Sequence, residues 1–478
     1  MTGKKTSGRP LFWAAVLALV TVLLFAVCSS PVPEKTGENP NETGEPQEPG
    51  KPQEPGEPQE PGKPQEPGEP QEPGEPQEPG EPQEPGEPQE PGEPQEPGEP
   101  QEPSGELMTP QEIFAALKGK QVTTYGWADR ANNGAGLSYA NPASLTLIND
   151  ENYPNPINKR EAFTSAINNN NEKFIIVSGD IDLSDGKISD ADKSFFNQFD
   201  PATNNRVNND IRFNLGSNTT LIGINNARLM FGGINISGRS NVIIRNITFY
   251  DAHGSTEKNT ASAGNSDSKA SIDAMTIQGG SDGVWVDHCK FTDGTCNDMI
   301  RNYNHDGALD IPAGINITVS WTEFTNHDKV MLVAGSDSLT TVTDRQITLH
   351  HNYFHATTQR MPRTRGTQMH VYNNYYNNIG VSGNTGYAMG PGVNAHFIVE
   401  NNFFGSIMSN KVVDYYDSAA YPAIVWSSGN NKTVARSSND KTGGSKPWEP
   451  AYSYTLEPNA GLPTSIPDGA GPVLEFRK

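Results

Sequence analysis

The residues of this chain that could do chemistry are concentrated in one short basic run. Residues 360–366 read Arg-Met-Pro-Arg-Thr-Arg-Gly, which places three guanidinium groups within six residues. Guanidinium groups bind carboxylates and phosphates in a bidentate manner. Pro362 favours extended backbone before it, so alternate side chains point to opposite faces and Arg363 and Arg365 would share one. The run predicts a site for an anionic ligand, with a solvated basic loop as the alternative.

The first 28 residues are predicted to be an export signal. Three cations within the first nine residues precede an apolar run that ends at Val27, as in secretory signals. Residues 24–30 read Leu-Phe-Ala-Val-Cys-Ser-Ser and resemble a bacterial lipobox with Cys28 as the lipidated residue. Val27 replaces the small residue usual before that Cys, so ordinary cleavage or an uncleaved anchor is the alternative. We expect a secreted or cell-surface protein, lipid-anchored to a bacterial membrane at Cys28.

Residues 29–106 are predicted to be a disordered linker. They repeat the unit Pro-Gln-Glu-Pro-Gly-Glu and lack the apolar residues needed for a core. The linker holds 22 Glu against 3 Lys, a charge of -19, and the export signal adds +3. The total of -22 therefore leaves only -6 for residues 107–478. The acidity of the chain lies in an extended stalk, and the folded domain is only mildly acidic.

The pattern of residues 107–478 predicts one all-β domain. Short apolar runs, each closed by an aromatic residue, start 42, 33, 30, 22 and 28 residues apart. A shortest spacing near 22 is typical of stacked coils with variable loops, whereas an antiparallel sandwich gives spacings of about 8 to 12. The six units cover residues 242–249, 284–291, 317–324, 347–354, 369–376 and 397–404.

Asparagines in these units suit sharp bends, where an amide can stack on its equivalent one coil away. Ordinary surface loops are the alternative for any one of them. Segments 111–118 and 160–167 are predicted to be helices that cap an open coil end. We therefore predict a right-handed parallel β-helix with small helical caps and long loops. The asparagines in question are Asn246, Asn352, Asn374 and Asn402.

Two cysteines remain if Cys28 carries lipid. Cys289 and Cys296 have six residues between them, which allows a local disulfide in an exported protein. Buried thiols are the alternative, and no zinc-type ligand spacing accompanies them.

Six motifs in order along residues 125–410 resemble the polysaccharide lyase family that includes pectate lyases and pectin lyases. Residues 284–289, Val-Trp-Val-Asp-His-Cys, resemble its Val-Trp-Ile-Asp-His signature, and residues 360–365 resemble its Arg-x-Pro-x-x-Arg motif. The resemblance implies a right-handed parallel β-helix, in agreement with the coil spacing. The four further motifs are residues 217–223, 241–247, 326–329 and 350–352.

The resemblance implies a calcium site at Asp273, Asp306 and Asp310. Pectate lyases bind calcium at the matching positions, whereas pectin lyases act on the neutral methyl ester and lack these acids. Ca²⁺ prefers several converging oxygen ligands, and adjacent coils bring such residues within reach. The three acids favour a pectate lyase, although a turn residue is the alternative for any single Asp.

Asp273 is the least regular of the three positions. The gap from Asp273 to Val284 is one residue longer than the usual family spacing. Asp282 and Asp267 are therefore the alternatives for this ligand.

The activity implied is β-elimination of α-1,4-polygalacturonate to 4,5-unsaturated oligogalacturonides. A domain of charge -6 does not attract a polyanion by net charge, so calcium, Lys329 and Arg365 are expected to bind the substrate carboxylates. Neutralising the C6 carboxylate acidifies the C5 proton and stabilises the carbanion that forms. Loss of the C4 oxygen then leaves the double bond.

Arg360 is the catalytic base by resemblance. A free guanidinium stays protonated, and neighbouring cations would have to lower its pKa. Asp287 and His288 could act as an acid and base pair, but the family pattern implies that they support the calcium coil. Arg363 is expected to be structural.

Two further functions fit parts of this pattern. A pectin lyase-type enzyme would act without calcium, and a surface β-helix that binds glycans without catalysis would not need Arg360 or the acids. A β-helix hydrolase is disfavoured because no paired carboxylic acids with its signature are present. We expect a monomer that contacts a membrane only through Cys28 and does not bind nucleic acid.

Overall fold

A computed structural model describes residues 105–186, 211–252, 272–294, 305–339, 341–342, 345–380, 386–434 and 445–478. These residues belong to one compact unit that begins at Pro97. The predicted export signal and almost all of the predicted stalk lie outside the described residues. In the part of the chain that is described, no helix has the length and apolar character needed to cross a bilayer.

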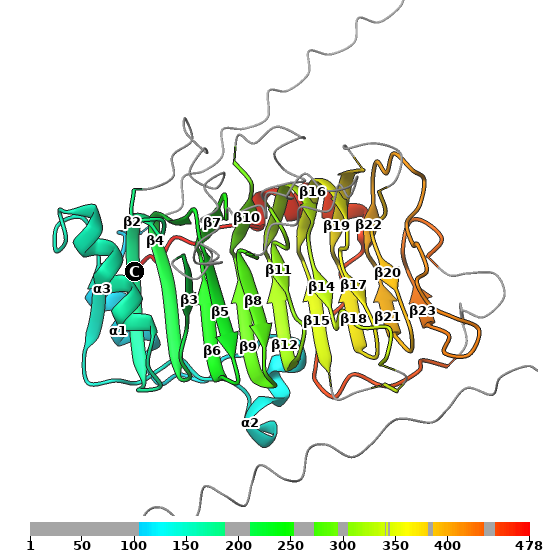
Figure 1. Cartoon of the computed structure of the whole chain (residues 1–478), viewed down its shortest axis with the longest axis horizontal. Coiled ribbons are helices and arrows are strands. Elements are labelled where there is room, and N and C mark those ends of the chain that lie inside the picture. The colour runs from blue at the N-terminus through cyan, green and yellow to red at the C-terminus, as the bar shows by residue number, and fades with distance from the viewer. Residues whose placement is uncertain are drawn as a thin grey trace, which may run out of the picture. The chain divides into compact units, whose positions relative to one another are not determined.

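Short parallel strands form three sheets, and a few helices flank them (Figure 1). The large sheet contains β1 (Leu145–Ile148), β2 (Lys173–Asp182), β4 (Thr219–Met230), β6 (Ser240–Arg245), β7 (Thr248–Tyr250), β9 (Ser281–Asp287), β10 (Lys290–Thr292), β12 (Gly314–Ser320), β13 (Glu323–Lys329), β15 (Gln346–His350), β16 (Tyr353–Gln359), β18 (Gln368–Tyr372), β19 (Tyr375–Ile379), β21 (His396–Glu400), β22 (Phe403–Phe404) and β23 (Ile424–Ser428). The smaller sheets contain β3 (Arg212–Asn214), β5 (Gly233–Ser237), β8 (Met275–Gln278) and β11 (Leu309–Asp310), and β14 (Leu332–Val333), β17 (Arg363–Thr364) and β20 (Gly390–Pro391). The helices are α1 (Pro110–Leu117), η1 (Trp127–Arg130), α2 (Ala131–Gly134), α3 (Pro156–Ile167), η4 (Asn459–Gly461) and α5 (Leu462–Gly469).

Each coil of the stack contributes three strands. β8, β9 and β10 make one coil, β11, β12 and β13 the next, and each strand pairs in parallel with its equivalent. Strands β3, β5, β8, β11, β14, β17 and β20 lie in that order along one side, which we call the third face (Figure 1). The protein is therefore a parallel β-helix, as predicted from the spacing of the apolar runs.

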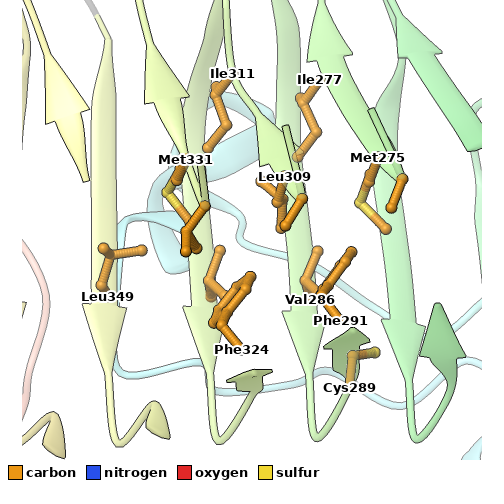
Figure 2. Packing of buried hydrophobic residues seen from close by; sticks show 14 of the residues in the cluster. Met275, Ile277, Val286, Cys289, Phe291, Leu309, Ile311, Phe324, Met331 and Leu349 are labelled. Carbon is orange, nitrogen blue, oxygen red and sulfur yellow. The ribbon is translucent and has the colours of Figure 1, made fainter. Parts of the chain in front are cut away.

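The predicted units stack in the register that the spacing implied. Phe249, Phe291, Phe324, Phe354 and Tyr376 are paired in sequence, with ring centroids 4.7–5.1 Å apart. Figure 2 shows Phe291 and Phe324 inside the coils, among buried apolar residues that include Met275 and Leu309 of the third face. Stacked rings of this kind contribute beyond the area they bury, so one interior column aligns successive coils.

A polar ladder runs beside the aromatic column. The Oδ1 atoms of Asn352, Asn374, Asn402 and Asn430 each accept the backbone N–H of the equivalent residue one coil earlier, at 2.8–3.0 Å. Three of these asparagines are fully buried. Because buried polar groups are costly unless bonded, the ladder fixes where each coil bends.

Asn246 was expected in this ladder and does not belong to it. It lies one position earlier, at a bend with a φ of 60°, and its side chain bonds Gly223 O and Leu474. Cys289 occupies the ladder position of the next coil and is buried (Figure 2). Burial raises the pKa of the Cys289 thiol to about 12, and Cys296 lies outside the described residues.

Residues 107–140, which we call the N-terminal strap, cross the outside of the large sheet. Trp127 N and Ala128 N bond to threonine hydroxyls of β15 and β12 at 3.0 Å. Both predicted helices form, but they differ in role. Phe163 and Ile167 of α3 join the interior core, whereas α1 packs with the strap on the outer surface, because its apolar residues meet outward side chains of β2.

The Asn ladder predicts a large stability effect at Asn374. Replacing Asn374 with Ala leaves the Asn352 N–H and two carbonyl oxygens without their bonds and should lower the free energy of unfolding by about 2–4 kcal/mol. Thermal unfolding followed by circular dichroism measures it. Gln368→Ala, at a partly exposed outward position of β18, is the control, and equal shifts for both variants would contradict the ladder's role.

Candidate functional site

The predicted site residues enter from the bends that lead into the third face. Asp273 precedes β8, Asp306 precedes β11, Lys329 ends β13, and Arg360 follows β16. Gly307 pairs with Lys329 in parallel, and Met331 N donates to Arg360 O at 2.7 Å. Parallel pairing thus places these residues at nearly equivalent positions on successive coils.

Asp273 and Asp310 approach each other across Gly307. Asp273 Oδ1 accepts from Gly307 N, and its Oδ2 from the Thr276 hydroxyl, both at 2.8 Å. Asp310 Oδ1 accepts from Leu332 N at 2.8 Å. A Cβ on residue 307 would collide with both Asp310 Oδ1 and Asp273 Oδ1. Glycine is therefore required for the two carboxylates to share this space.

The electrostatics of this acid pair are unfavourable for two negative charges. Burial, together with repulsion from Asp306, raises the pKa of Asp273 to about 6, while Arg212 acts in the opposite direction. Burial and repulsion from Asp273 hold the pKa of Asp310 well above its ordinary value. Desolvation and like charges both disfavour ionised carboxylates, so the pair would be stabilised by an added cation.

Asp306 and Lys329 are held by a buried histidine. Lys329 Nζ lies 3.4 Å from Asp306 Oδ1. His327 Nε2 lies 3.1 Å from both Asp306 O and Lys329 O, and its Nδ1 lies 2.6 Å from Asp293 Oδ1. Burial alone would lower the pKa of His327, but Asp293 raises it. A protonated His327 can donate from both nitrogens and so fix the backbone of two adjacent coils.

Arg360 and Arg363 each have a buried Nε atom. Among the described residues, nothing accepts a hydrogen bond from the Nε atom of either. The guanidinium of Arg363 lies over the Tyr416 ring, 3.6 Å from its centroid. Arg360 attracts Asp310 and so opposes in part the rise that burial and Asp273 cause in the pKa of that acid. Buried donors are rarely left unpaired, so these two arginines point to an anionic ligand.

Arg365 is already paired. Its Nε donates to Asp337 Oδ1 at 2.7 Å, and the Arg365 side chain is only 6% exposed. Arg363 and Arg365 share the outer side of the third face because Thr364 between them pairs with the buried Val333. Arg365 makes no other hydrogen bond to a described residue, so its remaining N–H groups are the part that a substrate could use.

Asp287 and His288 lie elsewhere, at the bend between β9 and β10. Asp287 bonds Arg245 at 2.7 Å, the Ser320 hydroxyl at 2.6 Å and His288 Nδ1 at 2.7 Å. Burial would raise the pKa of Asp287, but Arg245 and His288 lower it to about 2. The pair belongs to a polar network between sheet and strap and makes no contact with the three acids.

The structure does not support Asp282 or Asp267 as the calcium ligand in place of Asp273. Asp282 is the second residue of β9, where it accepts a bond from Asn316 Nδ2 at 2.7 Å. Asp267 lies outside the described residues.

The three acids are not assembled as a finished metal site. In the described ranges, no three His, Cys, Asp or Glu side chains are arranged to hold an ion. Asp306 is turned toward Lys329, whereas Asp273 and Asp310 converge. The donor set is entirely oxygen, which suits calcium, and Ca²⁺ completes its shell with carbonyl, water or substrate oxygens. The residues present therefore fit this cation by donor chemistry and by the repulsion it would relieve.

Sequence reasoning missed His327, Asp337 and Tyr416. His327 lies inside a motif recognised at residues 326–329, so a buried support role could have been considered there. Asp337 and Tyr416 have no periodic signal, because each comes from a loop that returns to the third face from another coil.

A sequence model of a family described as "Pectate lyase" matches residues 108–469. The chain belongs to the pectate lyase family. Among solved structures, one titled "Pectate lyase bound to hexasaccharide" is similar, with a TM-score of 0.58 and 25% identity, over 74% of this chain and 98% of that chain. Its architecture agrees with the coil stack described above.

Curated relatives in the pectate lyase family match part of their length. A "Pectate lyase" of Bacillus subtilis is 32% identical over 55% of this chain and 65% of its own. A "Pectate trisaccharide-lyase" of Thermotoga maritima is 39% identical over 35% of this chain and 43% of its own. This chain thus spans between two fifths and two thirds of these two relatives.

The repulsion between the acids predicts that Asp310→Asn stabilises the protein without metal. In excess chelator at pH 8, the variant should gain about 1–2 kcal/mol in free energy of unfolding, because a buried negative charge is removed. The gain should shrink as the pH falls toward 5, since the wild-type acids, with Asp273 near 6, then take up protons themselves. Denaturant unfolding at several pH values measures this.

Asp468→Asn, an exposed acid on α5, is the control for this comparison. An Asp310→Asn variant that is less stable than wild type in chelator at pH 8 would contradict the electrostatic description.

Proposed function

We propose that this protein is a calcium-dependent pectate lyase that cleaves α-1,4-polygalacturonate by β-elimination and releases 4,5-unsaturated oligogalacturonides. The observation that carries the proposal is the juxtaposition of two groups: Asp273 and Asp310, whose buried carboxylates converge across Gly307 and have raised pKa values, and Arg360, whose buried Nε has no acceptor among the described residues. A bound cation would stabilise the two carboxylates, and a bound anion would pair with the guanidinium. A calcium ion and a polyuronide carboxylate supply both.

The substrate carboxylates are bound by cations of the third face. Lys329 and Arg365 are the proposed binding residues, each now satisfied in part by Asp306 or Asp337. When substrate binds, its carboxylates would replace Asp306 and Asp337 as partners of these two cations. Lys329 and Arg365 are then paired with a carboxylate both before and after binding. Arg363 is held on Tyr416 and shapes the surface next to Arg365.

Asp273, Asp306 and Asp310 are the proposed calcium ligands. When bound, calcium neutralises a substrate carboxylate and so acidifies the C5 proton next to it. Gly307 keeps the space between Asp273 and Asp310 free of a side chain. His327 contacts the backbone carbonyls of both Asp306 and Lys329. It thereby holds the proposed calcium ligand Asp306 beside Lys329, which is proposed to bind the substrate.

Arg360 is the proposed base that removes the C5 proton. The electrons left at C5 are delocalised into the neighbouring carboxylate, where Lys329 and Arg365 stabilise the developing negative charge. The C4–O bond then breaks, C4 and C5 become doubly bonded, and the leaving oxygen takes up a proton. Preorganised cations at the site of charge development lower this barrier without having to reorient.

We also propose that the protein is exported and is lipid-anchored at Cys28. It would act as a monomer, with residues 29–106 forming a stalk. The charged and apolar regions before Cys28 support export and anchoring, and the repeat after it supports the stalk. The stalk would hold the catalytic domain away from the membrane, within reach of a polymer too large to enter the cell.

The proposal predicts a calcium-dependent rise in ultraviolet absorbance in polygalacturonate solution. The full chain should form unsaturated uronide with calcium, lose this activity in excess chelator, and recover it when calcium is restored, because the carboxylates need the cation to bind substrate productively. Equal activity in chelator would exclude the calcium assignment, and activity confined to highly methyl-esterified pectin would favour the pectin lyase alternative.

A second prediction concerns Arg360. Arg360→Ala should lower kcat by at least about a thousandfold, in the range expected for a lost catalytic group, with polygalacturonate binding largely retained. Arg130→Ala removes an exposed arginine of η1 and should leave kcat unchanged. A substantially active Arg360→Ala enzyme would mean that another group removes the proton.

A further inference from the structure

The third face continues beyond the acids, toward the start of the stack. Strand β8 pairs with β5, and β5 pairs with β3, all in parallel register. At about 4.8 Å per strand, β3 lies roughly 10 Å from β8 along the stack. Figure 1 shows β3, β5 and β8 side by side in this order, on the opposite side of β11 from β14 and β17.

Arg212 is an exposed cation on this extension. It pairs with Gly233 on β5, and Gly233 in turn packs against the main chain of Asp273. Its positive charge also acts on Asp273, where it opposes the rise in the pKa of that acid. Among the described residues, none forms a hydrogen bond or ion pair with the Arg212 side chain. Arg212 and Arg360 therefore flank the acids from opposite directions, each attracted to an Asp and neither bonded.

A chain of amides covers the surface between Arg212 and the acids. Asn235 Nδ2 donates to Asn214 Oδ1 at 2.6 Å, and Gln278 Nε2 donates to Asn235 Oδ1 at 2.7 Å. These bonds use both ends of Asn235 and leave Gln278 Oε1 and Asn214 Nδ2 unbonded by any described residue. An acceptor and a donor held in fixed positions suit sugar hydroxyl groups.

The two ends of the third face differ in positive charge, and Arg212 supplies that charge at the β3 end. Toward β17 the described residues supply Lys329, Arg360, Arg363 and Arg365, whereas toward β3 the cation of the third face is Arg212. A polyuronide carries a carboxylate on each residue, so a chain lying along the stack brings negative charge to both ends. Among the described residues of the β3 side, removal of Arg212 would leave the substrate carboxylates facing Asp273 and neutral amides.

We propose that the substrate groove extends across β8 and β5 to β3, where Arg212 binds a second carboxylate of the polyuronide and the amides of Asn214 and Gln278 bind its hydroxyl groups. This inference rests on the proposed function for its substrate class. It assigns to Arg212 a role in binding long substrates and none in the chemical step.

Direct binding and steady-state kinetics test this at pH 8 and saturating calcium. In an Arg360→Ala background, which separates binding from turnover, Arg212→Ala should weaken polygalacturonate binding about tenfold by calorimetry, the equivalent of one charge-assisted contact. In the otherwise wild-type enzyme, it should raise KM by a similar factor and change kcat less than twofold. Arg212→Lys should recover part of the loss, and added salt should reduce the difference.

Two substrates and one control variant sharpen the result. Trigalacturonate is too short to span the five strand spacings, roughly 24 Å, from Arg360 to Arg212, so its KM should not change. Arg130→Ala, an exposed arginine outside the third face, should bind the polymer like its parent. Polymer affinity within twofold of the parent in Arg212→Ala, or the same loss in Arg130→Ala, would overturn the proposal.

The calcium dependence separates binding from an indirect effect. If higher calcium restores polymer binding to Arg212→Ala, Arg212 acts through Asp273 and the groove assignment is wrong. If the wild-type chain forms no unsaturated uronide, the proposed function fails, but the binding comparison still decides whether Arg212 holds the polyanion.

Discussion

The parallel register between successive coils is the constraint on which the site depends. Phe291, Phe324 and Phe354 pair with one another in sequence inside the stack, and this alignment carries every outward residue with it. Gly307 therefore meets Lys329, and Asp310 lies next to Thr276. A slip of one residue would turn each of these side chains to the other side of its strand. Interior packing that touches no substrate thus sets the geometry of the exterior.

The site concentrates charge that the metal-free protein cannot fully balance. Asp273 and Asp310 have raised pKa values because they are buried close together, while the buried Nε atoms of Arg360 and Arg363 have no acceptor in the part of the chain that the structure describes. Both conditions cost stability. The ion pairs of Asp306 with Lys329 and of Asp337 with Arg365 offset part of this cost. The arrangement is best explained as preparation for ligands of both signs.

The coil stack could be predicted from the sequence because its core repeats. An aromatic that closes each apolar run must face inward, and six such units suffice to set the register. Residue type alone could not separate Asn246 from Asn352, although one lies at the left-handed bend and the other in the ladder one position later. That difference depends on backbone conformation, which neighbouring coils impose.

Site residues that lie in sequence motifs could be predicted. The residues that loops contribute to the site could not. The motifs contained Lys329, Arg360 and Arg365, and the structure brings the first two to nearly equivalent positions on adjacent coils. The Asp337 partner of Arg365 and the Tyr416 ring under Arg363 come from loops on other coils. Their positions follow from three-dimensional packing, for which a single sequence carries no periodic signal. Helix α1 was misjudged for the same reason, since its partners are outward side chains of β2.

The N-terminal strap also bears on the order in which the domain assembles. Trp127 and Ala128 bond to Thr348 and Thr318, which follow them by 221 and 190 residues, and the Tyr372 hydroxyl bonds Tyr125 O across 247 residues. Coils, by contrast, pair with neighbours a few tens of residues away. Closing long loops carries the larger entropic cost, so residues 125–128 of the strap can dock only after the coils from β12 to β18 are in place. This segment is synthesised before those coils and reaches its final contacts after them.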